Sequence, residues 1–403
     1  MIRLENISFD HCIKCTVCTV YCPVARATPR YPGPKASGPD TERLRIKNPG
    51  LVDESLQYCN NCKRCEIACP SDVRIADIIQ TAKWKYLRRR VRPRDFLLSR
   101  TDLLGRLATL VSPAANAASG SPLVKTLLSR FVRIPRQRTF PRYARGTFAR
   151  WFRQHAPDQD RFPEKVVYFH GCYVNYNDHD LGRDVVRVLN ALGVGVIVTR
   201  EVCCGVPLIA GGYAARARKN ARRNLAALSR AVIGDAKIVS ASSTCVYALK
   251  NEYPNFLGLD NSALRDRVEY IAKFLVRRLG ATGGPPLRPL DLTAAYHAPC
   301  HLERLGGAVD TVELLRQIPG LDLKLLPSEC CGLAGTYGFK AEFHPIAQAV
   351  GADLFERIRA LRPEVVVTDC ETCKWQIEEN TPYQVVHPVT LLARSMGPES
   401  YSS

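Results

Sequence analysis

The sequence predicts an α+β protein in which a helical amino-terminal domain is followed by a duplicated α/β domain with parallel strands. Three observations support this prediction: two four-cysteine runs of identical spacing near the start, an internal repeat in the second half, and alternating strand-like and helix-like patterns within each copy. The chain has 403 residues, enough for several domains. We place their limits at 1–82, 83–160, 161–284 and 285–403.

The cysteine content is the most unusual feature of the composition. There are 17 cysteines, an odd number in a long chain, which is atypical of small disulfide-stabilised secreted domains. The first residues lack the apolar stretch of a secretory signal, and no apolar run approaches the roughly 18 residues of a membrane-spanning helix. We therefore expect neither a secreted disulfide protein nor an integral membrane protein, and we expect reduced thiols that serve as metal ligands or core residues.

The first eight cysteines form two runs with the spacing C-x2-C-x2-C-x3-C, each followed by a proline, Pro23 or Pro70. This is the spacing of bacterial ferredoxins, in which three cysteines of one run and the fourth of the other hold each [4Fe–4S] cluster. Zinc sites pair C-x2-C units and do not repeat this run. The prediction is a helical ferredoxin-like domain with two [4Fe–4S] clusters, one held by Cys12, Cys15, Cys18 and Cys69 and the other by Cys22, Cys59, Cys62 and Cys65.

The remaining nine cysteines form two sets whose corresponding members lie 125 to 128 residues apart. Each set contains the tripeptide Cys-Cys-Gly, and the flanking segments VVYFHGC and AAYHAPC also correspond, so the second half is an internal duplication. The first set is Cys172, Cys203, Cys204 and Cys245, and the second is Cys300, Cys330, Cys331, Cys370 and Cys373.

Strand-like and helix-like segments alternate in each copy, which indicates a parallel sheet. The cysteines lie just past the strand ends, where α/β sheets build their sites. The expected strands are 166–170, 194–199, 237–241, 293–297, 323–326 and 365–368, and the expected helices are 181–192, 214–231 and 346–361. A shorter helix is expected near 42–46, and residues 283–286 are expected to link the two copies.

Positive charge is concentrated between the amino-terminal domain and the repeats. The segment from Lys83 to Arg153 has 18 basic and 2 acidic residues and supplies most of the net charge of +19. Apolar residues recur at helical spacing around residues 103–111 and 123–132. Basic amphipathic helices are typical of attachment to anionic membrane surfaces or to partners, although packing of the same helices on the protein's own core is also open. Nucleic-acid binding is not expected, because no recognised module accompanies the charge.

Taken together, these motifs resemble the CCG-domain iron–sulfur proteins, a family that includes heterodisulfide reductase subunits, glycolate oxidase iron–sulfur subunits and iron–sulfur subunits of anaerobic glycerol-3-phosphate dehydrogenases. The segments CIKCTVCTVYCPVAR, RYPGPKASGPD, YCNNCKRCEIACPSDV, FHGCYVNYN, ECCGLAGTYGFK and TDCETCKWQIE carry the resemblance, which runs nearly end to end. It implies that a non-cubane [4Fe–4S] cluster is held by Cys300, Cys330, Cys331, Cys370 and Cys373.

The first repeat departs from the family pattern, because Ala248 stands where the last cysteine would be. The resemblance therefore leaves the metal in this repeat open: the four thiols of Cys172, Cys203, Cys204 and Cys245 would suit a cubane cluster or zinc, or hold no metal. His170 and His297 precede the first cysteine of each repeat, and His301 follows Cys300; each is either a neighbour that tunes a cluster or a structural hydrogen-bonding residue.

The resemblance further implies an electron-transfer subunit at the cytoplasmic face of the inner membrane, peripherally bound to anionic lipid. It would accept electrons from flavin-containing dehydrogenase subunits A and B that oxidise glycerol 3-phosphate, and pass them towards menaquinone in anaerobic respiration. No glycine-rich dinucleotide fingerprint follows a strand, so we expect no flavin or NAD here and no substrate oxidation by this chain alone. The alternatives are a subunit of a glycolate or lactate oxidase, a disulfide reductase acting at the second repeat, and a basic redox-sensing regulator.

Overall fold

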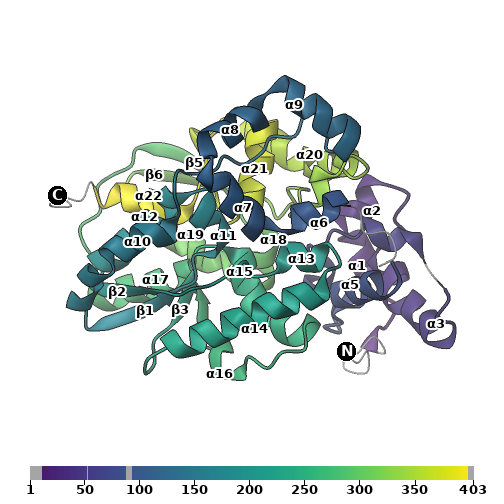
Figure 1. Ribbon diagram of the computed structural model, residues 1–403, viewed down its shortest axis with the longest axis horizontal. Helices are drawn as coiled ribbons and strands as arrows, with labels where there is room; N and C mark the ends of the chain where they lie inside the picture. Colours follow the sequence, from purple (N-terminus) through teal and green to yellow (C-terminus); the bar gives the residue numbers. More distant parts are fainter. Residues whose placement is uncertain (1–10, 52, 88–92, 398–403) are drawn as a thin grey trace.

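The computed structural model describes residues 11–51, 53–87 and 93–397 (Figure 1). The first ten residues, on which the expectation of no secretory signal depends, and residues 88–92 of the basic segment lie outside the described residues. The amino-terminal helices gather at one end of the molecule, and the strands of the two repeats lie towards the other (Figure 1).

The amino-terminal domain is built from short helices around the two cysteine runs. Its core includes Leu56, Ile75, Ile78 and Ile79, which are almost completely buried. The expected helix near residues 42–46 is α3. The elements are α1 (Val17–Val20), α2 (Pro23–Ala27), the π-helical η3 (Ala36–Asp40), α3 (Thr41–Lys47), η4 (Glu54–Tyr58), α4 (Arg64–Ile67) and α5 (Ile75–Tyr86).

The basic segment forms a succession of helices on the surface. Its elements are α6 (Pro93–Ser99), α7 (Thr101–Leu110), α8 (Ser112–Gly120), α9 (Pro122–Leu127), η6 (Leu128–Val132), α10 (Phe148–His155) and η7 (Pro157–Arg161). Both expected amphipathic helices are present, as α7 and as α9 with η6; the segment between them, expected as a break, is the additional helix α8. Pro113 and Pro122 lie in the first turns of α8 and α9, where proline is tolerated because those amides have no helical partner.

Several apolar side chains of α7, α9 and η6 are exposed to solvent, while others, such as Leu104 and Leu128, are partly buried. Leu110, Leu123 and Phe131 are 78%, 70% and 74% exposed, and Leu107 and Leu127 are also exposed. These five side chains therefore do not pack on the protein's own core, although α7 also contacts α11 of the first repeat. Among the described residues, no helix combines the length and apolar character needed to cross a membrane.

Each repeat contains a four-stranded parallel sheet within the described residues. The strand orders are β2-β1-β3-β4 and β6-β5-β7-β8, so the two sheets have the same topology. The first sheet comprises β1 (Glu164–Tyr168), β2 (Val194–Val198), β3 (Ile238–Ser240) and β4 (Val268–Tyr270). The second comprises β5 (Leu292–His297), β6 (Leu321–Leu325), β7 (Val365–Thr368) and β8 (Val385–Val386). The predicted fold class is confirmed.

Helices cover the sheets and connect their strands. In the first repeat these are α11 (Gly171–Tyr176), α12 (His179–Ala191), α13 (Val206–Ala210), α14 (Ala214–Ala231), α15 (Ser243–Tyr247), η8 (Ala248–Phe256), α16 (Ser262–Arg265) and α17 (Ile271–Thr282). In the second they are α18 (Cys300–Arg304), α19 (Ala308–Arg316), η9 (Tyr337–Phe339), α20 (His344–Leu361), α21 (Glu371–Asn380) and α22 (Pro388–Ser395). The expected helices correspond to α12, α14 and α20.

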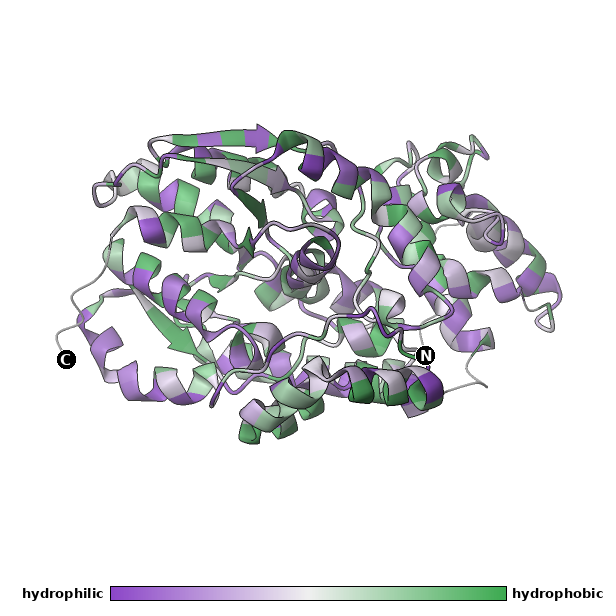
Figure 2. Ribbon diagram, turned by 90° about the horizontal axis from the view of Figure 1, so that it is seen from above, coloured by the Kyte–Doolittle hydropathy of each residue, from purple (hydrophilic) through white to green (hydrophobic). Residues whose placement is uncertain are grey.

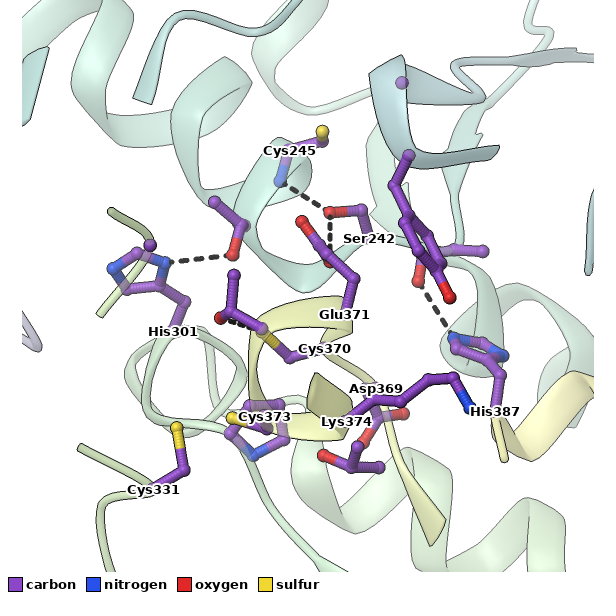
Figure 3. Close-up of a pocket in the computed structure, with 18 of the residues that line it drawn as sticks. Ser242, Cys245, His301, Cys331, Asp369, Cys370, Glu371, Cys373, Lys374 and His387 are labelled. Atoms are coloured by element: carbon purple, nitrogen blue, oxygen red, sulfur yellow. Dashed lines mark hydrogen bonds between the residues drawn. The ribbon is translucent and has the colours of Figure 1, made fainter. Parts of the chain in front are cut away.

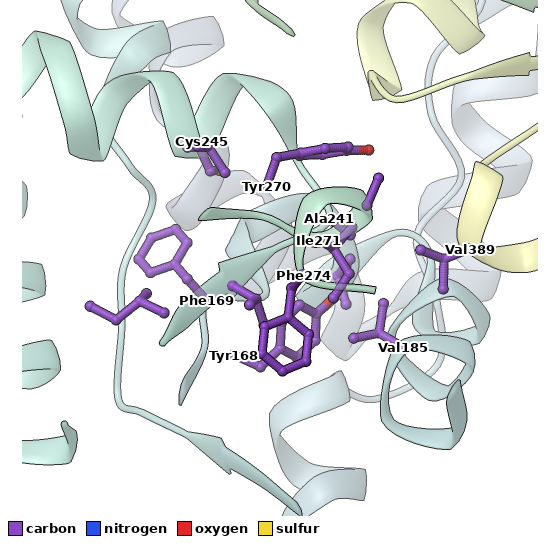
Figure 4. Close-up of a cluster of buried hydrophobic side chains, with 14 of the residues drawn as sticks. Tyr168, Phe169, Val185, Ala241, Cys245, Tyr270, Ile271, Phe274 and Val389 are labelled. Atoms are coloured by element: carbon purple, nitrogen blue, oxygen red, sulfur yellow. The ribbon is translucent and has the colours of Figure 1, made fainter. Parts of the chain in front are cut away.

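The six expected strands are present, β7 with its expected limits and the other five with shifts of one or two residues at their ends, whereas β4 and β8 are additional to the prediction. These two strands have three and two residues, too few for a clear hydrophobic pattern. Of the central strands, β3 and β7 are buried along their whole length, and β1 and β5 over their carboxyl-terminal parts. Several strands are apolar along most of their length (Figure 2). The main core joins both repeats, because α12 packs on α22 and α17 packs on α19, and Val389 lies beside Val185 (Figure 4).

Candidate functional site

The two amino-terminal cysteine loops have the same unusual backbone. Lys14 and Thr16 lie between cysteines of the first run, and Asn61 and Lys63 lie at the equivalent positions of the second; all four have φ between 59° and 65°. Left-handed conformations are unfavourable for residues with a side chain, so they persist only where the surrounding structure imposes them. Here they wrap each loop tightly and lead directly into a short helix, α1 or α4.

The structure brings the first eight cysteines together as two groups of four. Cys12, Cys15, Cys18 and Cys69 line one hollow, together with Ile13, Thr16 and Lys35. Cys22, Cys59, Cys62 and Cys65 line a second hollow, together with Tyr31 and Lys63. Burial raises the pKa of Cys18 and raises that of Cys22 to about 12, and neighbouring thiolates add to both shifts. A bound metal ion would offset these shifts and favour the thiolate forms of Cys18 and Cys22.

In the second repeat, five cysteines from three strand ends meet. Cys370 is the N-cap of α21 and Cys373 lies in its first turn, while Cys331 approaches from the Cys-Cys-Gly loop (Figure 3). Cys373 is within hydrogen-bonding reach of both Cys331 and Cys370, and its donation lowers the pKa of Cys370 to about 6. Cys300, at the start of α18, lies near this group, where burial and the charges of Cys330, Cys331 and Cys370 raise its pKa.

In the first repeat, four cysteines meet in the equivalent place. The sulfur atoms of Cys172 and Cys203 are 4.0 Å apart, and Cys204 is within hydrogen-bonding reach of Cys203 and Cys245. Ala248, at the position of the absent fifth cysteine, is fully buried.

Thr101 adds a polar group that the sequence did not indicate. Its hydroxyl lies 3.5 Å from the sulfur of Cys172 and 3.3 Å from that of Cys203. The residue belongs to α7 in the basic segment, far away in sequence, and no motif marks it.

The cysteines of both repeats open onto one cavity of about 300 Å³. Glu371 of the second repeat lies 3.4 Å from the hydroxyl of Ser242, which caps the helix of Cys245 (Figure 3). Burial and the nearby Cys370 raise the pKa of Glu371 to about 8. Cys62 of the amino-terminal domain also lines this cavity, and its sulfur is within hydrogen-bonding reach of Cys330. The second amino-terminal group and the second repeat are thus in direct contact.

The three histidines next to the repeat cysteines are all removed from bulk water. Burial lowers the pKa of His170, His297 and His301 to about 4 in each case, so all three are neutral at physiological pH. His170 lies 2.8 Å from the carbonyl of Gly171, a structural hydrogen bond, and His301 stacks on Tyr247. His297 lines the cavity, and among the described residues neither of its ring nitrogens has a hydrogen-bond partner.

Comparison with known proteins identifies the domains that contain these cysteines. A model of the cysteine-rich CCG domain matches residues 166–250 and 294–378, and a model of the 4Fe-4S dicluster domain matches residues 8–73. The C subunit of the anaerobic glycerol-3-phosphate dehydrogenase of Escherichia coli K12 is 51% identical over 395 residues, which is 98% of this chain and 100% of that protein. The chain belongs to the family of this dehydrogenase C subunit, within the CCG-domain iron–sulfur proteins.

More distant relatives act in other systems. The D subunit of the dihydromethanophenazine:CoB–CoM heterodisulfide reductase of Methanosarcina barkeri is 24% identical over 93% of this chain and 90% of its own length. Lactate utilization protein A of Bacillus velezensis is 32% identical over 44% of this chain and 75% of its own length. A 4Fe-4S dicluster domain followed by two CCG domains therefore defines the protein as an iron–sulfur protein.

The donor sets fit the clusters that this family implies. Each amino-terminal hollow presents four soft sulfur ligands, the number that a [4Fe–4S] cluster uses. The second repeat presents five and the first repeat four. Within the described residues, no three potential ligands converge on one point as a single metal ion requires.

Proposed function

We propose that this chain is the iron–sulfur electron-transfer subunit of a membrane-associated anaerobic glycerol-3-phosphate dehydrogenase. Its partners would be flavin-containing subunits A and B, and its acceptor the menaquinone pool at the cytoplasmic face of the inner membrane. The contact of Cys62 with Cys330 is the main structural support, because it joins the amino-terminal cysteine groups to the second repeat. Bound [4Fe–4S] clusters would supply one-electron transfer between partners.

We assign three cluster sites and one open site to the cysteines. Two [4Fe–4S] clusters belong to the amino-terminal groups and a non-cubane [4Fe–4S] cluster to the second repeat, while the metal of the first repeat stays open.

Cys15 is exposed, and the nearby Ile13, Val20 and Tyr21 are 66%, 68% and 54% exposed. An apolar surface beside the first group suits docking of the electron-donating subunit.

A cysteine replacement tests the assignment of the second repeat. Cys331→Ser should remove about four iron atoms per chain, because a serine hydroxyl is a poor substitute for a soft thiolate ligand. Iron and labile sulfide analysis with electron paramagnetic resonance, on anaerobically purified protein, measures the loss. Cys204→Ser in the first repeat is the matched control and should leave the second-repeat signal unchanged. Full iron content in Cys331→Ser would contradict the assignment.

The partner is tested by the source of electrons. Oxidised protein should be reduced when glycerol 3-phosphate and the flavin-containing dehydrogenase are both added, and by neither alone. Reduction with a lactate or glycolate dehydrogenase instead would favour the corresponding oxidase subunit.

The cavity of about 300 Å³ between the repeats is the observation that favours disulfide reduction as a second candidate. Turnover of a heterodisulfide by the isolated chain with an artificial electron donor would support that candidate.

The exposed apolar faces of α7, α9 and η6 support attachment to a membrane surface. Burying a large apolar side chain contributes about 1.5–3 kcal/mol, so changing both Leu123 and Phe131 to aspartate should weaken vesicle binding by at least about 100-fold. Co-sedimentation with anionic and neutral vesicles measures this, and the anionic preference should fall with salt. Ile233→Asp is the control, because Ile233 is 73% exposed but lies in another part of the surface. Equal losses in both variants would refute attachment by these helices.

A further inference from the structure

Two helices of the basic segment pack against the parts of the first repeat that carry its cysteines. The helix α7 contacts α11, which includes Cys172, and α6 contacts α13, which directly follows the first Cys-Cys-Gly loop (Figure 1). The junction of α6 with α7 therefore lies close to two of the segments that supply thiols. Thr101, the first residue of α7, belongs to this junction.

The contacts of α6 and α7 with the first repeat are very close. A Cβ added to Gly105 of α7 would lie 2.4 Å from Cδ2 and 2.9 Å from Cβ of Tyr176, the last residue of α11. A Cβ added to Gly211, which follows α13, would lie 2.2 Å from the Oγ of Ser99, a buried residue of α6. Because neither position has room for a side chain, this packing fixes the two helices against the repeat.

The hydroxyl group of Thr101 faces two of the thiols. Its Oγ1 lies 3.3 Å from the sulfur of Cys203 and 3.5 Å from the sulfur of Cys172. A threonine hydroxyl has one hydrogen to donate, and sulfur can accept it. The shorter distance makes Cys203 the better acceptor, and the Cys172 sulfur lies beside it at 4.0 Å.

The equivalent cysteine of the second repeat is also contacted by another domain. Cys203 and Cys330 correspond, since each is the first cysteine of its Cys-Cys-Gly tripeptide. Cys330 is within hydrogen-bonding reach of Cys62 of the amino-terminal domain, whereas Cys203 is contacted by Thr101 of the basic segment. Each repeat thus presents the same cysteine to a neighbouring domain, and the first repeat receives a hydroxyl where the second receives a thiol.

The first repeat lacks the fifth cysteine, and its replacement cannot take over a polar role. Ala248 is fully buried, and a methyl group neither binds a metal nor donates a hydrogen bond. Four thiols are nevertheless enough for a zinc ion or a [4Fe–4S] cluster. Hydrogen bonds to such ligands from groups behind them fix the ligand orientation and increase metal affinity. Thr101 is placed to supply one from outside the repeat.

We propose that Thr101 is a positioning residue for a thiolate-bound metal centre in the first repeat. Its hydroxyl donates a hydrogen bond to the coordinating sulfur of Cys203 and keeps Cys172 beside it, and the packing of α7 on α11 places it there. The inference rests on the proposed iron–sulfur function and deepens it by extending one metal site into the basic segment.

Metal release from the full-length, anaerobically purified protein tests this proposal. Iron and zinc are measured in wild type and in Cys204→Ser, and the difference gives the metal of the first repeat. Losing a hydrogen bond behind a metal ligand lowers metal affinity about 10- to 100-fold. Thr101→Val has nearly the same shape without the hydroxyl and should release this metal to a chelator at least about tenfold faster. Thr101→Ser restores the hydroxyl and should release it at nearly the wild-type rate.

A second pair of variants tests whether α7 places the hydroxyl. Gly105→Ala should also speed the release, because its Cβ would push α7 away from Tyr176. Gly120→Ala is the matched control, since an added Cβ there would meet no atom within 4 Å. The melting temperature and the electron paramagnetic resonance signal of the second repeat, measured on every variant, separate a local effect from loss of folding.

Faster release in Thr101→Val and Gly105→Ala, with wild-type rates in Thr101→Ser and Gly120→Ala, would support the proposal. Equal metal contents in wild type and Cys204→Ser would overturn it, as would a wild-type rate in Thr101→Val or in Gly105→Ala, or equally fast release from Thr101→Ser and Thr101→Val. If the dehydrogenase reduces the protein while Thr101→Val releases metal at the wild-type rate, this inference alone fails. If the variants behave as expected but the dehydrogenase does not reduce the protein, the proposed function fails and the role of Thr101 stands.

Discussion

Changing Gly332 to alanine should destabilise the protein by about 3 kcal/mol and deplete iron from the second repeat. Gly332 has φ of +86°, and an added Cβ would lie 2.0 Å from the carbonyl oxygen of Ala347. A left-handed conformation costs a non-glycine residue about 1–2 kcal/mol, and relieving the overlap adds a further 1–3 kcal/mol. Because displacing the backbone of α20 would cost more free energy than moving a loop, the loop carrying Cys330 and Cys331 must move. Thermal unfolding and iron analysis measure the two effects.

Gly335→Ala is the matched control for Gly332→Ala. Gly335 also has positive φ, +62°, but an added Cβ would meet no atom within 4 Å. This control should therefore show only the conformational cost and retain iron in the second repeat. Equal effects of the two substitutions would mean that close packing against α20 does not hold the loop in place.

Changing Lys63 to methionine should lower the free energy of unfolding by about 3–5 kcal/mol, because it leaves buried carboxylates without their cation. The Lys63 side chain is completely buried, and its Nζ pairs with Asp77, lies 3.4 Å from Glu252 Oε1 and lies 3.7 Å from Glu66 Oε1. Burial by itself lowers the pKa of Lys63, but the three carboxylates outweigh it and raise that pKa well above its usual value. Chemical denaturation measures the change.

The ion pairs of Lys63 with Asp77, Glu252 and Glu66, here called the Lys63 network, also connect the amino-terminal domain to the first repeat. Glu252 belongs to η8 of the first repeat, and the Lys63 Nζ lies 5.6 Å from the ring centroid of Tyr247. Lys63→Met should therefore loosen the contact between the amino-terminal domain and the first repeat. Lys165→Met removes a surface ion pair with Asp160 and, as the control, should cost no more than about 1 kcal/mol. A similar small cost for Lys63→Met would contradict the role of the network.

The fold is predictable where a pattern is long or repeated. The helix over 214–231 is predicted with its observed limits, because its eighteen residues show a sustained helical period and end before a strand. Strands β1, β2 and β7 are short apolar runs next to cysteine motifs. By contrast, Val385–Val386 becomes a strand only because it pairs with β7, and the sequence contains no local sign of that pairing.

For the candidate site, cysteine spacing indicates the groups but not their neighbours. The spacing of the two four-cysteine runs by itself predicts the two amino-terminal groups, the one that contains Cys12 and Cys69 and the one that contains Cys22 and Cys59. Neither the approach of Thr101 to Cys172 nor that of Cys62 to Cys330 follows from a motif. Both join segments far apart along the chain, and such contacts depend on how separate elements pack.

The sequence by itself determined the iron–sulfur family, the duplication and the α+β class, because cysteine spacing and apolar periodicity are local properties of the chain. Only the tertiary structure decided that the thiols of both repeats share one cavity, that Lys63 ties two domains together, and that Tyr337 lies buried beside Cys59. These contacts form when the domains dock and bury residues that lie hundreds of positions apart in the sequence. No local sequence pattern predicts such contacts.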